Sequence, residues 1–167
     1  MSEGTGPARR PQGSRSRDTA GRPRNDRPRD SLGQPLPPGS VGVEPVPDEL
    51  DDLPPDEAID YAQRLLDEGR AFGAHEVLEA VWKSAPDTER ELWRSLAQLA
   101  VGVTHLQRGN LRGAQELSRR GATGLGPFRA GAQYGLRIDD LARAGEELAE
   151  AIAAGQVPSV PRLRLRR

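Results

Sequence analysis

The sequence predicts an all-α protein, a compact bundle of about five helices between a disordered N-terminal arm and a short disordered C-terminal tail. Apolar residues recur at helical spacing between residues 53 and 156, and no alternating β-branched run typical of strands occurs. Both flanking segments are rich in arginine and proline and poor in large apolar side chains. We therefore expect an arm with an acidic linker at 1–52, a helical-bundle domain at 53–156 and a basic tail at 157–167.

The composition of the chain limits its chemistry. The 167 residues carry a formal net charge of -1 and include no cysteine, which removes disulfides, thiolate metal sites and cysteine nucleophiles. The N-terminus has no apolar signal-peptide core, and no apolar run approaches the roughly 18 residues of a membrane span. We expect a cytoplasmic protein that does not contact the membrane.

The two flanking segments are strongly charged. The arginines of the arm alternate with acidic residues, and no aromatic residue is present there for base stacking, so we do not expect nucleic acid as a partner. Residues 44–60 hold eight acidic and no basic residues, a block that repels itself and favours an extended linker. The tail, "PSVPRLRLRR", is basic and interrupted by proline, so we expect it to fray.

The first two helices are defined by their ends. Prolines and acidic residues open the segment from Asp56, where they suit the positive end of the helix dipole, and Gly69 ends it. The segment "AFGAHEVLEAVWKSAP" is the second predicted helix, which ends before Pro86.

The third predicted helix is the longest and the most informative. A capping box from Thr88 to Glu91 opens it and Gly109 closes it. Gly102 lies away from its main apolar stripe and would allow a neighbouring helix to approach closely, so we expect this helix to be central. The stripe consists of Leu92, Leu96, Leu99, Val103 and Leu106.

The last two helices flank a glycine- and proline-rich loop. Asn110 is the predicted N-cap of "LRGAQELSRRGA". The loop that follows is expected to fold over the bundle through Phe128 and Tyr134. Asp139 is the predicted cap of the fifth helix, "IDDLARAGEELAEAIAAG".

Polar residues on the second and third helices form one candidate constellation. His75 and Glu79 are one helical turn apart, and Gln98 and His105 lie roughly opposite the apolar stripe of the third helix. If these helices pack together, the partly enclosed side chains need hydrogen-bond partners, which predicts a His/Glu/Gln network. The candidate pocket residues are His75, Glu76, Glu79, Trp82, Gln98, His105 and Asn110.

The same residues carry a resemblance to a known family. The stretches "FGAHEVLEAVW", which fits the pattern F-x-A-H-E-x-x-E-x-x-W, and "LAQLAVGVTHLQRGNLRGA" are similar to the small helical proteins catalogued as domain of unknown function 309. The resemblance extends from about Asp56 to Ala154, and Thr104 stands where members commonly carry an aromatic residue. It implies a compact all-helical bundle and supplies no established reaction.

Three interpretations of the constellation remain: a buried network that joins two helices, a pocket for a small ligand or a protein, and an enzyme or metal site that uses His75, Glu79 and His105. The chain has neither a His-Glu-x-x-His nor a Glu-x-x-His motif, and no fourth ligand is evident, so we predict no metal and no cofactor. We favour a helical binding or scaffolding domain, with a second copy of the chain among its candidate partners. A small His/Glu-dependent enzyme is the alternative.

Overall fold

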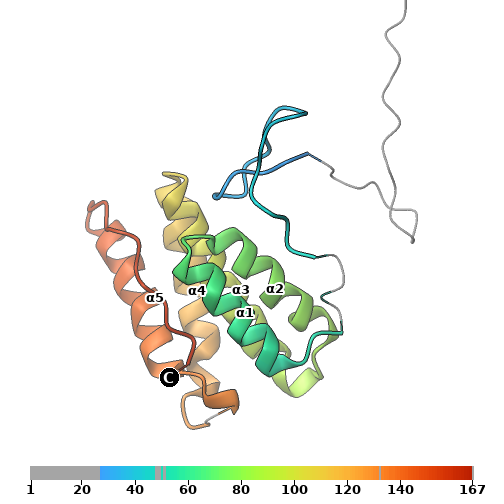
Figure 1. Ribbon diagram of the computed structural model, residues 1–167. Coiled ribbons are helices and arrows are strands. Elements are labelled where there is room, and N and C mark those ends of the chain that lie inside the picture. Colours follow the sequence, from blue (N-terminus) through green and yellow to red (C-terminus); the bar gives the residue numbers. More distant parts are fainter. Residues whose placement is uncertain (1–26, 48–49, 51, 132, 167) are drawn as a thin grey trace, which may run out of the picture.

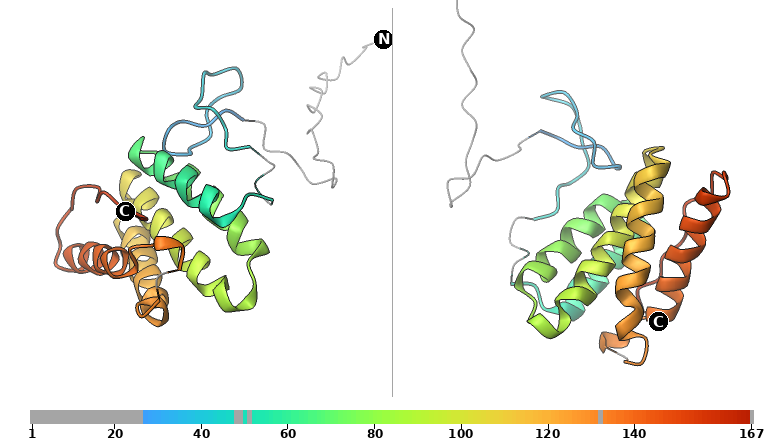
Figure 2. Two further views of the ribbon diagram at one scale, coloured as in Figure 1. Left: turned by 60° about the horizontal axis from the view of Figure 1, so that its bottom comes forward. Right: turned by 180° about the vertical axis from the view of Figure 1, so that it is seen from behind.

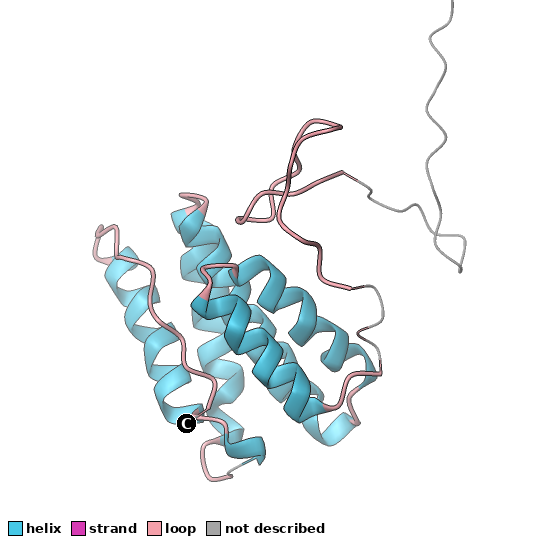
Figure 3. Ribbon diagram, viewed as in Figure 1, coloured by secondary structure: helices cyan, strands magenta, loops and turns pink. Residues whose placement is uncertain are grey.

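Helices form most of the computed structural model (Figure 1), which describes residues 27–47, 50, 52–131 and 133–166. The disorder predicted for residues 1–26 lies outside the described residues. The described part contains two isolated β-bridges and no strand (Figure 3), which confirms the all-α, five-helix prediction. Its helices are α1 (Pro55–Asp67), α2 (Ala71–Ser84), α3 (Asp87–Gln107), α4 (Leu111–Leu125) and α5 (Ile138–Ala153), with 3₁₀ turns at Gly126–Phe128 and Gln133–Gly135.

Each helix packs against the next one in the sequence, as the views in Figures 1 and 2 show. Two or three residues connect α1 to α2, α2 to α3 and α3 to α4, and such short connections make consecutive helices antiparallel neighbours. None of the helices in the described part of the chain has both the length and the apolar character needed to cross a membrane.

The central helix of the bundle is α3, as predicted. Every residue of its predicted apolar stripe is buried. On another side, Gly102 packs so tightly on α4 that an added Cβ would lie 2.4 Å from the hydroxyl oxygen of Ser118. The absence of a side chain at Gly102 therefore sets the close approach of α3 and α4.

Trp93 on α3 is the largest fully buried side chain of the bundle. Its indole nitrogen donates a hydrogen bond to the carboxylate of Glu89 at 3.2 Å, and the hydroxyl of Tyr134 donates to the same carboxylate at 2.9 Å. The rings of Trp93 and Tyr134 lie 5.5 Å apart. The loop after α4 thus folds over the core through Tyr134 and the partly buried Phe128, as the sequence predicted.

The predicted helix caps are correct at one site and wrong at two. The side chain of Asn110 accepts a hydrogen bond from the amide of Gly113 and caps α4. The Thr88 capping box does not form, because α3 already begins at Asp87 and the extended Pro86 occupies the cap position. Asp139 lies inside the first turn of α5, whose cap position is held by Arg137.

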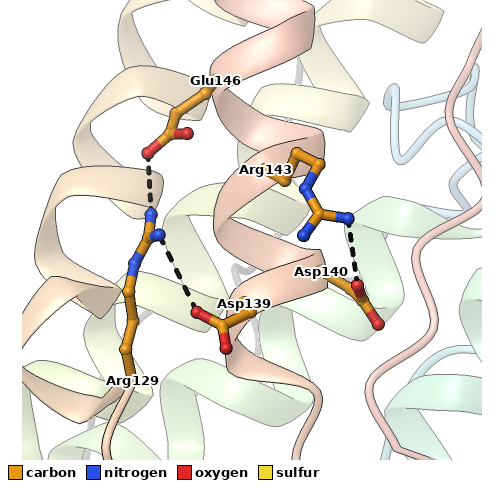
Figure 4. Close-up of polar contacts among 5 residues, drawn as sticks. All are labelled: Arg129, Asp139, Asp140, Arg143 and Glu146. Carbon is orange, nitrogen blue, oxygen red and sulfur yellow. Dashed lines mark hydrogen bonds and ion pairs between the residues drawn. The ribbon is translucent and has the colours of Figure 1, made fainter.

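Asp139 instead belongs to a set of ion pairs around α5 (Figure 4). Arg129, in the loop before α5, reaches Asp139 at 3.8 Å and Glu146 at 2.9 Å. Arg143 pairs with Asp140 at 3.4 Å. These side chains are largely exposed, so the pairs orient the loop on α5 and contribute little to stability.

The C-terminal tail packs against the bundle, which corrects the prediction of a disordered segment after residue 156. Leu163 and Leu165 are only 5% and 2% exposed and belong to the main core. The alternation of "RLRLR" explains this, because an extended chain directs its leucines to one side and its arginines to the other. The predicted boundary at residue 156 therefore leaves two core residues outside the domain.

Main-chain contacts hold the tail in place. The side-chain amide of Gln63 accepts from the amide of Leu165 at 2.7 Å and donates to the carbonyl of Leu163 at 3.2 Å. The amide of Arg137 donates to the carbonyl of Leu165 at 2.8 Å, and Arg166 pairs with Asp56 at 2.7 Å. The tail thus connects α1 with the start of α5.

Residues 27–47, assigned by the sequence to the disordered arm, form a closed loop beside α2 (blue in Figure 1). Within this loop the amide of Leu36 donates to the carbonyl of Pro28 at 2.7 Å, and that of Val43 donates to Arg29 at 2.9 Å. The loop lacks a core of its own, so its position depends on contacts with the helices, which are described next.

Candidate functional site

The first turns of α2 present the histidine motif at the margin of the core. Phe72, His75, Glu76 and Glu79 are spaced so that they share one side of α2, and all four are half-buried. The rings of Phe72 and His75 lie 5.8 Å apart. The opposite side of α2 is buried in the bundle, so a rigid helix positions these four side chains.

His75 is tied to Glu79, as the spacing of one helical turn predicted. Its Nε2 lies 3.0 Å from a carboxylate oxygen of Glu79, and the other oxygen contacts Lys83 at 3.0 Å. The second ring nitrogen, Nδ1, is buried and has no hydrogen-bond partner within the described part of the chain. Burial lowers the pKa of His75, and the charges of Lys83 and Arg108 lower it further against the opposing effect of Glu79.

This lowered pKa predicts a pH dependence of stability. The unfolded chain takes up a proton at His75 near pH 6.5, whereas the folded chain does so only at lower pH. The unfolded state therefore binds more protons, and the folded state loses stability as the pH falls from 6.5 through the folded pKa. We expect the free energy of unfolding, measured by denaturant titration between about pH 8 and pH 5, to depend less on pH in His75→Gln than in the wild type. Parallel curves for the two proteins would contradict the assignment.

The N-terminal loop lies directly on Phe72. The guanidinium groups of Arg29 and Arg108 stand 5.2 and 5.3 Å from the centre of its ring. Gly33 packs against the same ring, where an added Cβ would come within 2.2 Å of it. Its φ of +73° is also in the left-handed region that favours glycine. The contact therefore requires an aromatic ring at Phe72 and no side chain at Gly33.

Arginines of the helical domain bind the main chain of this loop. Arg108, at the end of α3, donates from Nε and Nη2 to the carbonyl of Leu32 at 2.9 and 2.6 Å. Arg70, before α2, donates to the carbonyl of Glu44 at 2.5 Å. A cleft of about 900 Å³ remains between the loop and α2, and Glu76 is among its lining residues. The domain thus holds the loop mainly through backbone acceptors.

His105 and Asn110 form a second polar site at the turn between α3 and α4. The Nδ2 of Asn110 lies 3.0 Å from Nδ1 of His105, and the Oδ1 of Asn110 accepts from the amide of Gly113 at 3.0 Å. The His105 ring fits under Gly113, where an added Cβ would lie 2.8 Å from it. These contacts fix the geometry of the turn.

The remaining candidates lie elsewhere. Gln98 lines a groove between α3 and α4, and Trp82 is half-buried against the core. The structure therefore brings His75 and Glu79 together and pairs His105 with Asn110. No three His, Asp or Glu side chains in the described segments are grouped as metal ligands would be.

The sequence did not indicate the roles of Arg70 and Arg108 in holding the loop. Arg108 contacts a residue 76 positions away, and no local spacing can indicate such a contact. The one local feature that sets Arg108 apart in the sequence is its position beside Gly109, at the end of α3.

Comparisons with known proteins match part of this chain to one family model. Residues 59–117, which run from α1 into α4 and include the histidine motif, match the family model described as "Domain of unknown function (DUF309)". This match confirms the resemblance seen in the sequence over residues 59–117. No curated protein and no solved structure matches the chain.

Proposed function

We propose that this chain, whose residues 59–117 match the DUF309 family model, is a binding domain that holds a turn-containing polypeptide segment across α2 and the end of α3. One observation carries the proposal. The chain's own loop lies there, with Gly33 on the ring of Phe72 and the carbonyl of Leu32 bound twice by Arg108.

The contacts define what kind of segment fits. Charge-assisted hydrogen bonds from Arg70 and Arg108 go to main-chain carbonyl oxygens, which any polypeptide segment offers. The Phe72 ring accepts a glycine at its face and a cationic side chain such as Arg29 beside it. A glycine next to an arginine-rich stretch is therefore the recognised element, supplied in this structure by the chain itself.

The geometry of His75 supports binding over catalysis. One ring nitrogen contacts Glu79, and the other is buried, so neither is placed to exchange a proton with a substrate that arrives from solvent. The histidine instead packs against Phe72 and supports the ring that carries the loop.

A labelled peptide of residues 27–47 tests the proposal by fluorescence anisotropy with full-length protein. Gly33→Ala should displace the chain's own loop from Phe72, because the added Cβ collides with the ring. The Gly33→Ala protein should then bind the wild-type peptide about tenfold more tightly than the wild-type protein does, because the chain's own loop no longer competes for the site.

The matched control is Gly39→Ala. Gly39 also has a positive φ, +84°, but an added Cβ there would meet nothing within 4 Å. This variant carries the same backbone strain without the collision, so it should bind the peptide as weakly as the wild type. Equal peptide binding by the two variants, or binding that persists when Phe72→Ala is added to Gly33→Ala, would refute the proposal.

A further inference from the structure

A second surface feature, independent of the loop site, is the groove between α3 and α4. It has a volume of about 700 Å³ and is lined by four arginines, two glutamates, two glutamines, a threonine and a glycine. The two helices that form its walls lie side by side in both views of Figure 2. The side chains in the lining are charged or polar, which favours a ligand with charged or hydrogen-bonding groups.

The charges in this groove do not balance. Arg94 pairs with Glu91 at 3.5 Å, and Arg120 pairs with Glu116 at 2.5 Å. Arg112 and Arg119 face the same groove and have no carboxylate partner within the segments that the structure describes. Four arginines against two glutamates leave two uncompensated positive charges.

The two unpaired arginines are arranged to act together. Arg112 and Arg119 are seven positions apart on α4, which places them about two turns apart on one side of the helix. The amides of Gln98 on α3 and Gln115 on α4 add hydrogen-bond donors to the two walls between them. The groove therefore offers donors from both sides to one anion.

From this arrangement we propose that the α3–α4 groove binds a phosphorylated small molecule through Arg112 and Arg119. A phosphoryl group carries about −1.5 to −2 charges and three strong acceptor oxygens, so one group compensates both arginines. A carboxylate carries one charge and would leave the second arginine unpaired. The lining has no aromatic side chain for base stacking, which directs the proposal to the phosphoryl group rather than to a nucleobase.

Glu116 gives the proposal a variant with the opposite expected effect. Its carboxylate lines the groove and pairs with Arg120, so it competes with an anion for the arginines and repels it. Removing this charge should strengthen the binding of a phosphoryl group, whereas removing Arg112 or Arg119 should weaken it.

Isothermal titration of the full-length chain with inorganic pyrophosphate at low ionic strength tests the site. We expect saturable binding that Arg112→Gln and Arg119→Gln each weaken by about tenfold and that Glu116→Gln tightens severalfold. Arg143→Gln is the matched control, because Arg143 is an exposed helical arginine on α5, outside the groove. Circular dichroism confirms that each variant is folded.

Three results would overturn the inference. The first is that pyrophosphate fails to bind to the wild-type chain. The second is that Arg143→Gln weakens binding as much as Arg112→Gln does. The third is that a short glutamate peptide binds as tightly as pyrophosphate. The last result would assign the groove to carboxylates. The loop site shares no residue with this groove, so the outcome is separate from the test of the proposed function.

Discussion

Replacing Trp93 by alanine is expected to lower the free energy of unfolding by about 3 to 5 kcal/mol, which is a large part of the stability of a small domain. The Trp93 side chain is fully buried in α3, and its removal would leave a cavity at the centre of the core. It would also remove the donor that holds Glu89 in place beneath Tyr134. Urea denaturation, monitored by circular dichroism, measures the decrease in the free energy of unfolding.

Trp82→Ala provides the matched comparison. Trp82, the last residue of the histidine motif, is only half-buried on α2. Its replacement should therefore cost clearly less than that of Trp93. An equal or larger loss at Trp82 would show that the core is not centred on α3.

Leu165→Ala is expected to destabilise the protein by about 2 to 5 kcal/mol, although Leu165 is the third-last residue of the sequence. The side chain is 2% exposed, and the main chain around it is held by Gln63 and Arg137. Truncation after Pro158 should have at least the same effect, because it removes Leu163 as well.

Val157→Ala controls for changes to the tail. Val157 is 76% exposed, so replacing its side chain by that of alanine should leave the unfolding midpoint nearly unchanged. If Leu165→Ala unfolded at the same midpoint as the wild type, the tail would not be part of the core.

The features that the sequence predicted correctly depend on local spacing. The apolar stripe of α3 follows from a period of 3.6 residues, the contact of His75 with Glu79 from one helical turn, and the Asn110 cap from the preference for asparagine at a helix start. Each of these features is decided by residues within a few turns of one another.

The features that it missed depend on contacts between distant segments. Leu165 is 102 positions from Gln63, and Leu32 is 76 positions from Arg108. His105 and Gln98 share one side of α3, but the sequence could not decide whether that side would face α2 or α4. Gly113 of α4 receives the His105 ring, so His105 packs at the turn into α4.

The central claim is that Phe72 and Arg108 hold a turn-containing segment on the domain. Hydrogen exchange at the amides of Leu36 and Val43 tests it most directly, because these amides are bonded only while the loop keeps its folded form. We predict slower exchange in the full-length protein than in the free peptide of residues 27–47, and loss of this protection in Phe72→Ala. Exchange as fast in the wild-type protein as in the free peptide would contradict the claim, and so would protection that survives in Phe72→Ala.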